Sequence, residues 1–336
     1  GLPTEPVLEK MKRSNDKYAK SHTLTPRERI HNDTLYEFLL ERNRVDIALY
    51  EWAKTKSIVN CNSINGITSP HDNIDQKIHN QTFLKRTTQD GPVEKQQDMV
   101  VTKDARHFAD ENTKQLQIAN FKRNASLLLN VHITHHAGTT ACGIFKLYGP
   151  APDFACMGGE NWPVNVSEHK PWNGENETNI MIQELRPHFY MISWEFSSRE
   201  NPALSKTFWE HPNLVSVIIV RHPMDRLLAG DGFVSKYFGN TQDRTPDLWW
   251  EFANSYVTNN FALKVLTGNN GCCDGAATGE EHYHTAKELL SRFTFIVDQE
   301  CLTEGFVALV AQLGFPTEPV LERMKRSNEK YAKSHT

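Results

Sequence analysis

The chain of 336 residues contains 37 Lys and Arg against 41 Asp and Glu, which gives a formal net charge of −4 at pH 7. This length suits one large or two modest domains with a sizeable core, and the slightly acidic balance argues against a protein that binds nucleic acid through its charge. No apolar run is long enough for a membrane-spanning helix, and the first residues do not read as a signal peptide.

An internal repeat joins the two ends of the chain. Residues 1–23 recur at 314–336 with three differences: Leu2 against Phe315, Lys10 against Arg323 and Asp16 against Glu329. The period is a whole domain, which differs from the short periods of solenoid proteins. The repeat predicts either a tandem array of similar domains, in which case neighbouring domains are expected partners, or a circularly permuted unit with a short overlap.

The N-terminal third contains a helical segment and a polar one. Thr25 and Pro26 form a helix start, with Thr25 as the N-cap. The amphipathic segment to about Lys56 must bury these apolar positions against the core: Leu35, Phe38, Leu39, Val45, Ile47, Ala48, Leu49 and Trp52. Residues 57–123 read mostly as linker, with one helix near 103–122. We expect a helical tail at 1–56, which completes the fold in permuted order or ends a preceding tandem unit, a polar linker at 57–123 and a core at 124–336.

From residue 124 onward, strands alternate with helices. Strands are predicted at 127–133, 189–195, 215–220 and 293–297, and helices at 139–147, 178–185, 247–267, 281–291 and 303–313, with a further helix beginning within 221–226. This alternation predicts an α/β fold of three layers, α/β/α, with a central parallel sheet that binds ligands at the carboxyl ends of its strands.

The polar turn after the first strand is a candidate anion site. It comprises His135, His136, Ala137, Gly138, Thr139 and Thr140. Backbone N–H groups at a helix start, with hydroxyls and imidazoles beside them, favour a phosphate. The turn is not a Walker A loop, because no lysine precedes the last hydroxyl. The alternative is a strand–turn–helix corner that binds nothing.

Two segments resemble one known family. Val131–Thr140 resembles the 5′-phosphosulfate loop of PAPS-dependent sulfotransferases, especially the branch that sulfates carbohydrates, and Ser216–Leu228 (SVIIVRHPMDRLL) is similar to that family's 3′-phosphate segment. The closing part of that family is resembled by three segments of this chain, in the order 286–315, 324–336 and 24–54. The last segment ends in the pattern of Asp46–Tyr50 and lies near the N-terminus here, not after the others. The resemblance implies a P-loop-like sulfotransferase fold that transfers a sulfuryl group from PAPS to a hydroxyl or amine of a carbohydrate or small metabolite, leaving PAP.

The resemblance also assigns roles to individual residues. His135 or His136 stands where the family has a Lys or Arg that supports the leaving phosphate, and an imidazolium in that role implies activity that falls at high pH. Arg221 corresponds to the 3′-phosphate arginine, with Arg226 closing the same motif. The family's serine eight residues after that arginine is Ala229 here.

Glu195 is the candidate base that takes the acceptor proton. It follows Trp194 at the end of a predicted strand, where an apolar setting is expected to raise the pKa of its carboxyl group. His132 is the second candidate base, although its position on a strand also suits a buried structural histidine. The alternative is that Glu195 is a solvent-exposed loop glutamate without a catalytic role.

Two other functions remain open from the sequence. One is a related module that binds a nucleotide or glycan without catalysis, since the family's lysine and serine are missing. The other is a zinc hydrolase built on His132, His135 and His136, which the spacing and the lack of an HExxH pattern disfavour.

The cysteines and sequons bear on the compartment. The six cysteines form no CxxC pair, and one or two disulfides are compatible with a secretory chain. Five N-glycosylation sequons, at Asn32, Asn80, Asn124, Asn165 and Asn176, favour a secretory or Golgi lumen slightly over the cytoplasm or a plastid.

Overall fold

The computed structural model describes residues 25–30, 32–61, 111–152, 156, 174–196, 204, 207–229, 245–268 and 280–334. The contacts of the chain divide it into two units, residues 1–59 with 108–336, and residues 60–107. All described residues except Asn60 and Cys61 belong to the first unit.

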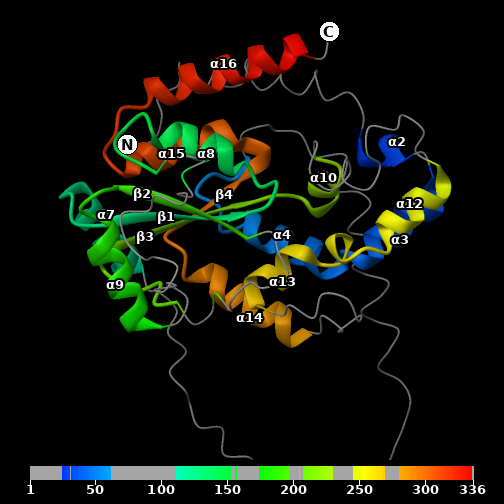
Figure 1. Cartoon of the computed structure of the whole chain (residues 1–336), viewed down its shortest axis with the longest axis horizontal. Coiled ribbons are helices and arrows are strands. Elements are labelled where there is room, and N and C mark those ends of the chain that lie inside the picture. Colours follow the sequence, from blue (N-terminus) through cyan, green and yellow to red (C-terminus); the bar gives the residue numbers. More distant parts are fainter. Residues whose placement is uncertain are drawn as a thin grey trace, which may run out of the picture. The chain divides into compact units, whose positions relative to one another are not determined.

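The centre of this unit is a sheet of four parallel strands in the order β2-β1-β3-β4 (Figure 1). The strands are β1 (Leu127–Ile133), β2 (Met191–Phe196), β3 (Leu214–Val220) and β4 (Phe295–Asp298). Every residue of β1 and β3 is buried, as is typical of the inner strands of a parallel sheet. The predicted α/β fold with a central parallel sheet is confirmed.

Helices cover both faces of the sheet, because successive side chains of each strand point to opposite faces. Leu127, Leu129 and Val131 of β1 pack in one apolar cluster, whereas Leu128 packs in the other. The first cluster includes residues of α3 (Asp33–Arg42), α4 (Arg44–Lys54), α9 (Glu175–Leu185), α12 (Pro246–Ala253), α13 (Phe261–Thr267) and α14 (Glu280–Ser291). The second includes residues of α7 (Glu111–Lys122), α8 (Gly138–Phe145), α15 (Leu302–Gln312) and α16 (Glu318–Ser334).

The predicted helix start at Thr25 is confirmed. The Thr25 hydroxyl accepts a hydrogen bond from the Glu28 N–H at 3.3 Å, and the Thr25 N–H donates to the Glu28 carboxylate at 2.6 Å, which is a capping box at the start of α2 (Pro26–Ile30). Farther on, Leu35, Leu39 and Leu49 are buried in the same cluster as the first strand. Residues 25–59 thus pack as part of the unit that contains the sheet.

The single helix predicted over 247–267 is wrong. The chain forms α12, a short 3-10 turn at Tyr256–Thr258, and α13 instead. Asn260 adopts a left-handed conformation (φ 41°) that interrupts a helix, and the side chain of Asn43 donates to the carbonyl of buried Thr258 at 2.8 Å. Tertiary contacts from the N-terminal segment therefore override the helical periodicity of this sequence.

Other predicted boundaries shift by a few residues. The helix expected near 103–122 is α7, and its Ile118 and Phe121 are buried in the second cluster, so this end of the predicted linker 57–123 packs with the core. The helix beginning after β3 is α10 (Pro223–Leu227). Of the two repeat copies, 314–336 contains α16, whereas 1–23 lies outside the described residues.

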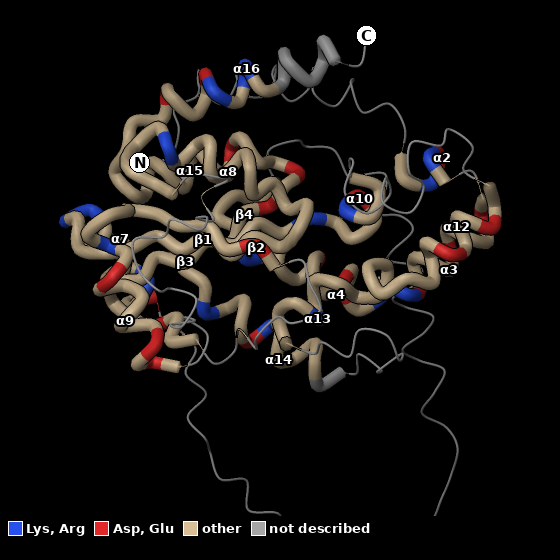
Figure 2. The backbone as a smooth tube through the Cα atoms, in the orientation of Figure 1, with Lys and Arg blue, Asp and Glu red and all other residues tan. Residues whose placement is uncertain are grey.

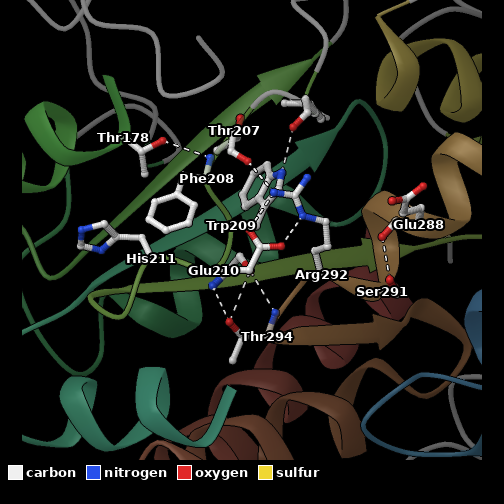
Figure 3. A network of polar contacts seen from close by, with 12 residues as sticks. Thr178, Thr207, Phe208, Trp209, Glu210, His211, Glu288, Ser291, Arg292 and Thr294 are labelled. Atoms are coloured by element: carbon white, nitrogen blue, oxygen red, sulfur yellow. Dashed lines mark hydrogen bonds and ion pairs between the residues drawn. The ribbon is translucent and has the colours of Figure 1, made fainter. Parts of the chain in front are cut away.

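A polar network stabilises the amino-terminal side of the sheet (Figure 3). The guanidinium of Arg292 donates to the carboxylate of Glu210 from Nε at 2.5 Å and from Nη2 at 2.7 Å, and also to the carbonyl of Thr207 at 3.0 Å. Thr294 donates to the side chain of fully buried Gln117 at 2.7 Å. This network pairs buried polar groups that would otherwise destabilise the fold.

The surface helices carry both signs of charge, as Figure 2 shows along α3 and α16. Among the described helices, none combines the length and the apolar character required to cross a membrane.

Candidate functional site

The turn between β1 and α8 has an unusual backbone. His135 (φ 69°) and Ala137 (φ 54°) both occupy the left-handed region, and the N–H of His136 donates to the carbonyl of Ile133 at 2.9 Å. Such conformations cost roughly 1–3 kcal/mol each for residues other than glycine and are concentrated at functional sites. α8 begins at Gly138, so the N–H groups of its first turn lie directly after this strained turn.

The turn is fastened to the strands on both sides of β1. Thr134 donates to the carbonyl of Phe196, at the end of β2, from its N–H at 3.3 Å and from its hydroxyl at 3.1 Å. On the other side, Nδ1 of His136 lies 2.8 Å from the carbonyl oxygen of Ile219 in β3. Arg221 follows β3 and donates from Nη1 to the carbonyl of His135 at 2.7 Å. These contacts bring together segments that are 62 to 86 residues apart in the sequence.

The two candidate bases are neighbours across β1 and β2. His132 is paired in register with Glu195, and its Nδ1 lies 3.9 Å from the Glu195 carboxylate. The His132 side chain is 9% exposed and that of Glu195 is 28% exposed, so solvent reaches the carboxylate more easily. The His132 ring also lies against Gly138, where a Cβ atom would come within 2.2 Å of it. Glycine at this position permits the close approach of α8 to β1.

Both histidines of the turn are neutral near pH 7. Burial is the main cause that lowers the pKa of His135 to about 4, and the charges of Arg226 and Arg221 lower it further. Burial likewise lowers the pKa of His136 well below 6.5. Because the Ile219 carbonyl can only accept, the proton of His136 is on Nδ1, and its Nε2 is an acceptor.

This protonation state changes what the turn can offer an anion. A neutral His136 with Nε2 as acceptor anchors the turn to β3 and does not donate to a phosphate. The positive charge near the turn comes from the two arginines, which both influence the pKa of His135 and of His136. The imidazolium that the resemblance implies for this turn is therefore not the form that the structure favours near pH 7.

The two arginines differ in their setting. Arg221 is partly exposed at the end of β3, beside the turn. Arg226 is 2% exposed, its guanidinium lies 3.6 Å from the centre of the Phe261 ring, and its Nη1 donates to the carbonyl of Val257 at 2.9 Å. Burial lowers the pKa of Arg226 to about 9, so it remains charged at neutral pH. Arg221 is thus placed to contact a ligand, whereas Arg226 contributes charge from beneath the site.

We expect the urea midpoint of unfolding to fall as the pH is lowered from 7.5 to 5. The pKa values of His132 and His135 are lowered to about 4 and that of His136 is lowered further, so the stability that these rings contribute is complete above pH 6.5 and is lost as the pH falls. Asp46 and Asp298 act in the opposite direction, because burial raises their pKa to about 6, but they are fewer.

The matched variant for this prediction is His132→Gln. It cannot titrate, so its midpoint should change less between the two pH values, even if the midpoint at pH 7.5 is lower. A parent chain that keeps or gains stability on acidification would contradict the assignment of neutral buried histidines.

Sequence reasoning missed a polar pair at the neighbouring strand end. The hydroxyl of Tyr50 donates to the carboxylate of buried Asp298 at 3.0 Å, and the Tyr50 ring contacts His222 edge-on with a centroid distance of 5.4 Å. Asp298 directly follows the apolar residues of β4, so its place at a strand end was a usable signal. α4 therefore borders the carboxyl ends of β3 and β4.

Two tryptophans of α12 lie away from the turn. Trp249 is buried in the first cluster and Trp250 packs edge-on against Phe38, so both serve in packing. Within the described ranges, no group of three His, Cys, Asp or Glu side chains is placed to hold a metal ion.

An open depression of about 480 Å³ lies elsewhere in the fold. Its lining residues are Asn124, Ala125, Ile182, Gln183, Arg186 and Pro187. Asn124 and Ala125 precede β1, so the depression lies at the amino-terminal end of that strand, away from the turn. It has no part in the site described above.

The fold and the site define an α/β protein with a polar turn at the carboxyl ends of its parallel strands and two arginines beside that turn. No family model, curated protein or solved structure matches the chain.

Proposed function

We propose that the chain is a PAPS-dependent sulfotransferase with a P-loop-like, three-layer α/β/α sulfotransferase fold. The single observation that carries the proposal is the hydrogen bond from Arg221 to the carbonyl of His135. It joins the segments 131–140 and 216–228, which resemble the family's binding segments for the two phosphate ends of one cofactor. The fit to an anion is also supported by the helix start at Gly138 and by the two arginine charges near the turn.

Each residue of the turn has a proposed part in holding PAPS. The backbone N–H groups from Ala137 to Thr140 and the exposed hydroxyl of Thr139 are donors for the 5′-phosphosulfate. Arg221 is the donor for the 3′-phosphate, and Arg226 adds charge from the interior. His135 is partly exposed and acts toward the leaving phosphate, to which its neutral ring offers one N–H donor. PAPS itself supplies the activated sulfuryl group.

Glu195 is the proposed base for the acceptor hydroxyl or amine. Its carboxylate is the more exposed member of the pair with His132, and it lies at the carboxyl end of β2 next to the turn. His132 is neutral and packed beneath Gly138, so its proposed role is to hold Glu195 and the turn in position. The acceptor is a carbohydrate or another small metabolite, by resemblance to the family.

Calorimetric titration with PAP, the desulfated product, tests the cofactor site. We expect the parent chain to bind PAP in the micromolar range and Arg221→Ala to bind it about 10- to 100-fold more weakly, since a hydrogen bond to a charged group contributes about 1.5–3 kcal/mol. Arg221→Lys should retain part of the affinity, because it keeps the charge and loses the planar donor geometry.

The matched control is Arg326→Ala. Arg326 is an exposed arginine of α16 that pairs with Glu322 at 3.1 Å, so its removal should leave PAP binding unchanged. A folded parent chain that does not bind PAP would refute the proposal that the chain is a sulfotransferase. Equal losses of PAP affinity in Arg221→Ala and Arg326→Ala would refute the role of Arg221.

A binding module without catalysis is the second candidate. It is favoured by the neutral state of His135 and His136, which are weaker than lysine at stabilising a leaving phosphate. This candidate predicts PAP binding without release of PAP from PAPS in the presence of carbohydrate acceptors. Release of PAP that depends on an acceptor and on Glu195 would decide for the enzyme.

A further inference from the structure

Three N-glycosylation sequons fall within the described residues. They are Asn32-Asp33-Thr34, Asn124-Ala125-Ser126 and Asn176-Glu177-Thr178, and each of the three asparagines is exposed. Sequons arise by chance in any chain rich in asparagine, so the sequence alone says little. Their positions in the fold add information, because a glycan requires an asparagine at the surface with its amide nitrogen accessible.

The amide groups leave that nitrogen available. Oδ1 of Asn32 accepts from the N–H of Leu35 at 2.9 Å, and Oδ1 of Asn124 accepts from the guanidinium of Arg186. Among the described residues, Nδ2 of these two asparagines donates no hydrogen bond. Asn176 lies in the first turn of α9, and its side chain makes no hydrogen bond within the described part of the chain. Attachment of a sugar at Nδ2 therefore breaks no contact at any of the three sites.

The sulfur chemistry points to the same compartment by an independent route. Cys142 in α8 and Cys156 form a disulfide, and both residues are buried. Cys61 and Cys301 are also in disulfides, so each of the four described cysteines is oxidised. Disulfides persist in oxidising compartments and are rare in the cytosol.

We propose that this chain folds in an oxidising secretory lumen and carries N-linked glycans on Asn32, Asn124 and Asn176. The inference does not depend on the sulfotransferase proposal. The buried hydroxyls of Ser126 and Thr178 do not prevent it, because the glycan is added while the chain is still extended. A glycan on Asn124 would lie at the amino-terminal end of β1, away from the site beside Arg221.

The two modifications are separate covalent reactions. In glycosylation, Nδ2 forms a bond with the anomeric carbon of a sugar, the sugar's bond to its lipid diphosphate donor breaks, and the amide proton and the diphosphate leave. In oxidation, the thiols of Cys142 and Cys156 lose two protons and two electrons to a protein disulfide of the thiol–disulfide exchange class, which is reduced to two thiols.

The test is site mapping on the chain isolated from its natural source. An amidase that releases N-glycans in ¹⁸O water converts each occupied asparagine to labelled aspartate, which mass spectrometry detects in the peptides. We expect label at Asn32, Asn124 and Asn176. Lack of label at one of them refutes that site, and lack of label at all three overturns the proposal.

Two variants sharpen the test in eukaryotic cells that express the chain in their secretory pathway. Asn176→Gln should migrate faster in gel electrophoresis than the parent chain, by the shift that one glycan causes. Asn112→Gln is its matched control, because Asn112 is also the exposed second residue of a helix that begins Glu-Asn, α7, and has no sequon. An unchanged mobility in Asn176→Gln would refute the glycan at that residue.

Alkylation of the native chain without reduction tests the disulfide. The unreduced chain is denatured and then alkylated. We expect Cys142 and Cys156 to remain unmodified and to appear together in one disulfide-linked peptide. Alkylated thiols at both positions would refute the disulfide between Cys142 and Cys156 and the argument for the compartment that rests on it.

Discussion

Gly138→Ala is expected to lose PAP binding and to destabilise the fold by about 1–3 kcal/mol, the usual cost of overpacking. The new Cβ atom would lie 2.2 Å from Nδ1 and Cε1 of the His132 ring, well below any real contact distance. The ring is buried on β1 and has Glu195 beside it, so it cannot simply swing into solvent. The start of α8 must shift instead, and with it the N–H groups proposed to bind phosphate.

Gly143→Ala in the same helix is the matched control. There the new Cβ atom would meet Nη2 of Arg323 at 2.6 Å, which is the far end of a flexible side chain that can move aside. Since alanine favours a helix over glycine by about 1 kcal/mol, this variant should be neutral or slightly more stable. Urea unfolding and PAP titration of both variants would measure the contrast.

A double variant checks the cause of the predicted loss. His132→Ala removes the ring that the new methyl group would meet, so Gly138→Ala should cost less stability in that background than in the parent chain. Equal costs in the two backgrounds would show that the packing of His132 under Gly138 is not the reason.

Asp46→Ala is expected to cost about 3–5 kcal/mol of unfolding free energy, because it removes the acceptor of two N–H groups at the start of α13 and a buried charge of opposite sign to Arg226. The Asp46 carboxylate is 3% exposed and accepts from the N–H groups of Ala262 at 2.9 Å and Leu263 at 2.7 Å, at the start of α13. Its charge also offsets that of buried Arg226. In return, Oδ1 of Asn260 accepts from the N–H of Asp46 at 2.9 Å.

Asp33→Ala is the control for this variant. Asp33 lies in the first turn of α3 and pairs with Arg27 at the surface, where such interactions contribute about 1 kcal/mol or less. Asp46→Asn should fall between the two, since it keeps one acceptor oxygen and loses the charge. Chemical unfolding of the three variants at pH 7.5 measures the order, and an Asp46→Ala loss no larger than that of Asp33→Ala would contradict the stabilising role of the Asp46 carboxylate.

Much of the fold was predictable from local pattern. The strand Leu214–Val220 is a continuous apolar run, and Thr25-Pro26 is a helix start with its own capping residues, so neither depends on distant parts of the chain. The break between α12 and α13 was not predictable. It depends on Asn43 and Asp46, more than 200 residues upstream, and local periodicity carries no information about such partners.

The candidate site was predictable in its residues and less so in their roles. Because the carboxyl ends of parallel strands meet at one edge of the sheet, the sequence predicted that His135, Glu195 and Arg221 would lie at that edge. The sequence could not show that His136 would donate to Ile219 and stay neutral, because protonation depends on burial and on the geometry of one carbonyl. It also could not show that Arg226 would stack on Phe261, since the two residues are 35 positions apart.

The contacts of α4 have a consequence for the order in which the chain acquires structure. The residues that Tyr50 and Asp46 bind lie 248 and 217 positions downstream, at Asp298 and Leu263. A ribosome adds about 5–20 residues per second, so α4 waits roughly 10–50 s after its own synthesis before its partners exist. Contacts between such distant positions also slow folding once the chain is complete, because the intervening segment must be closed into a loop first. The edge of the sheet beside the proposed site is therefore expected to be among the last parts of the molecule to fold.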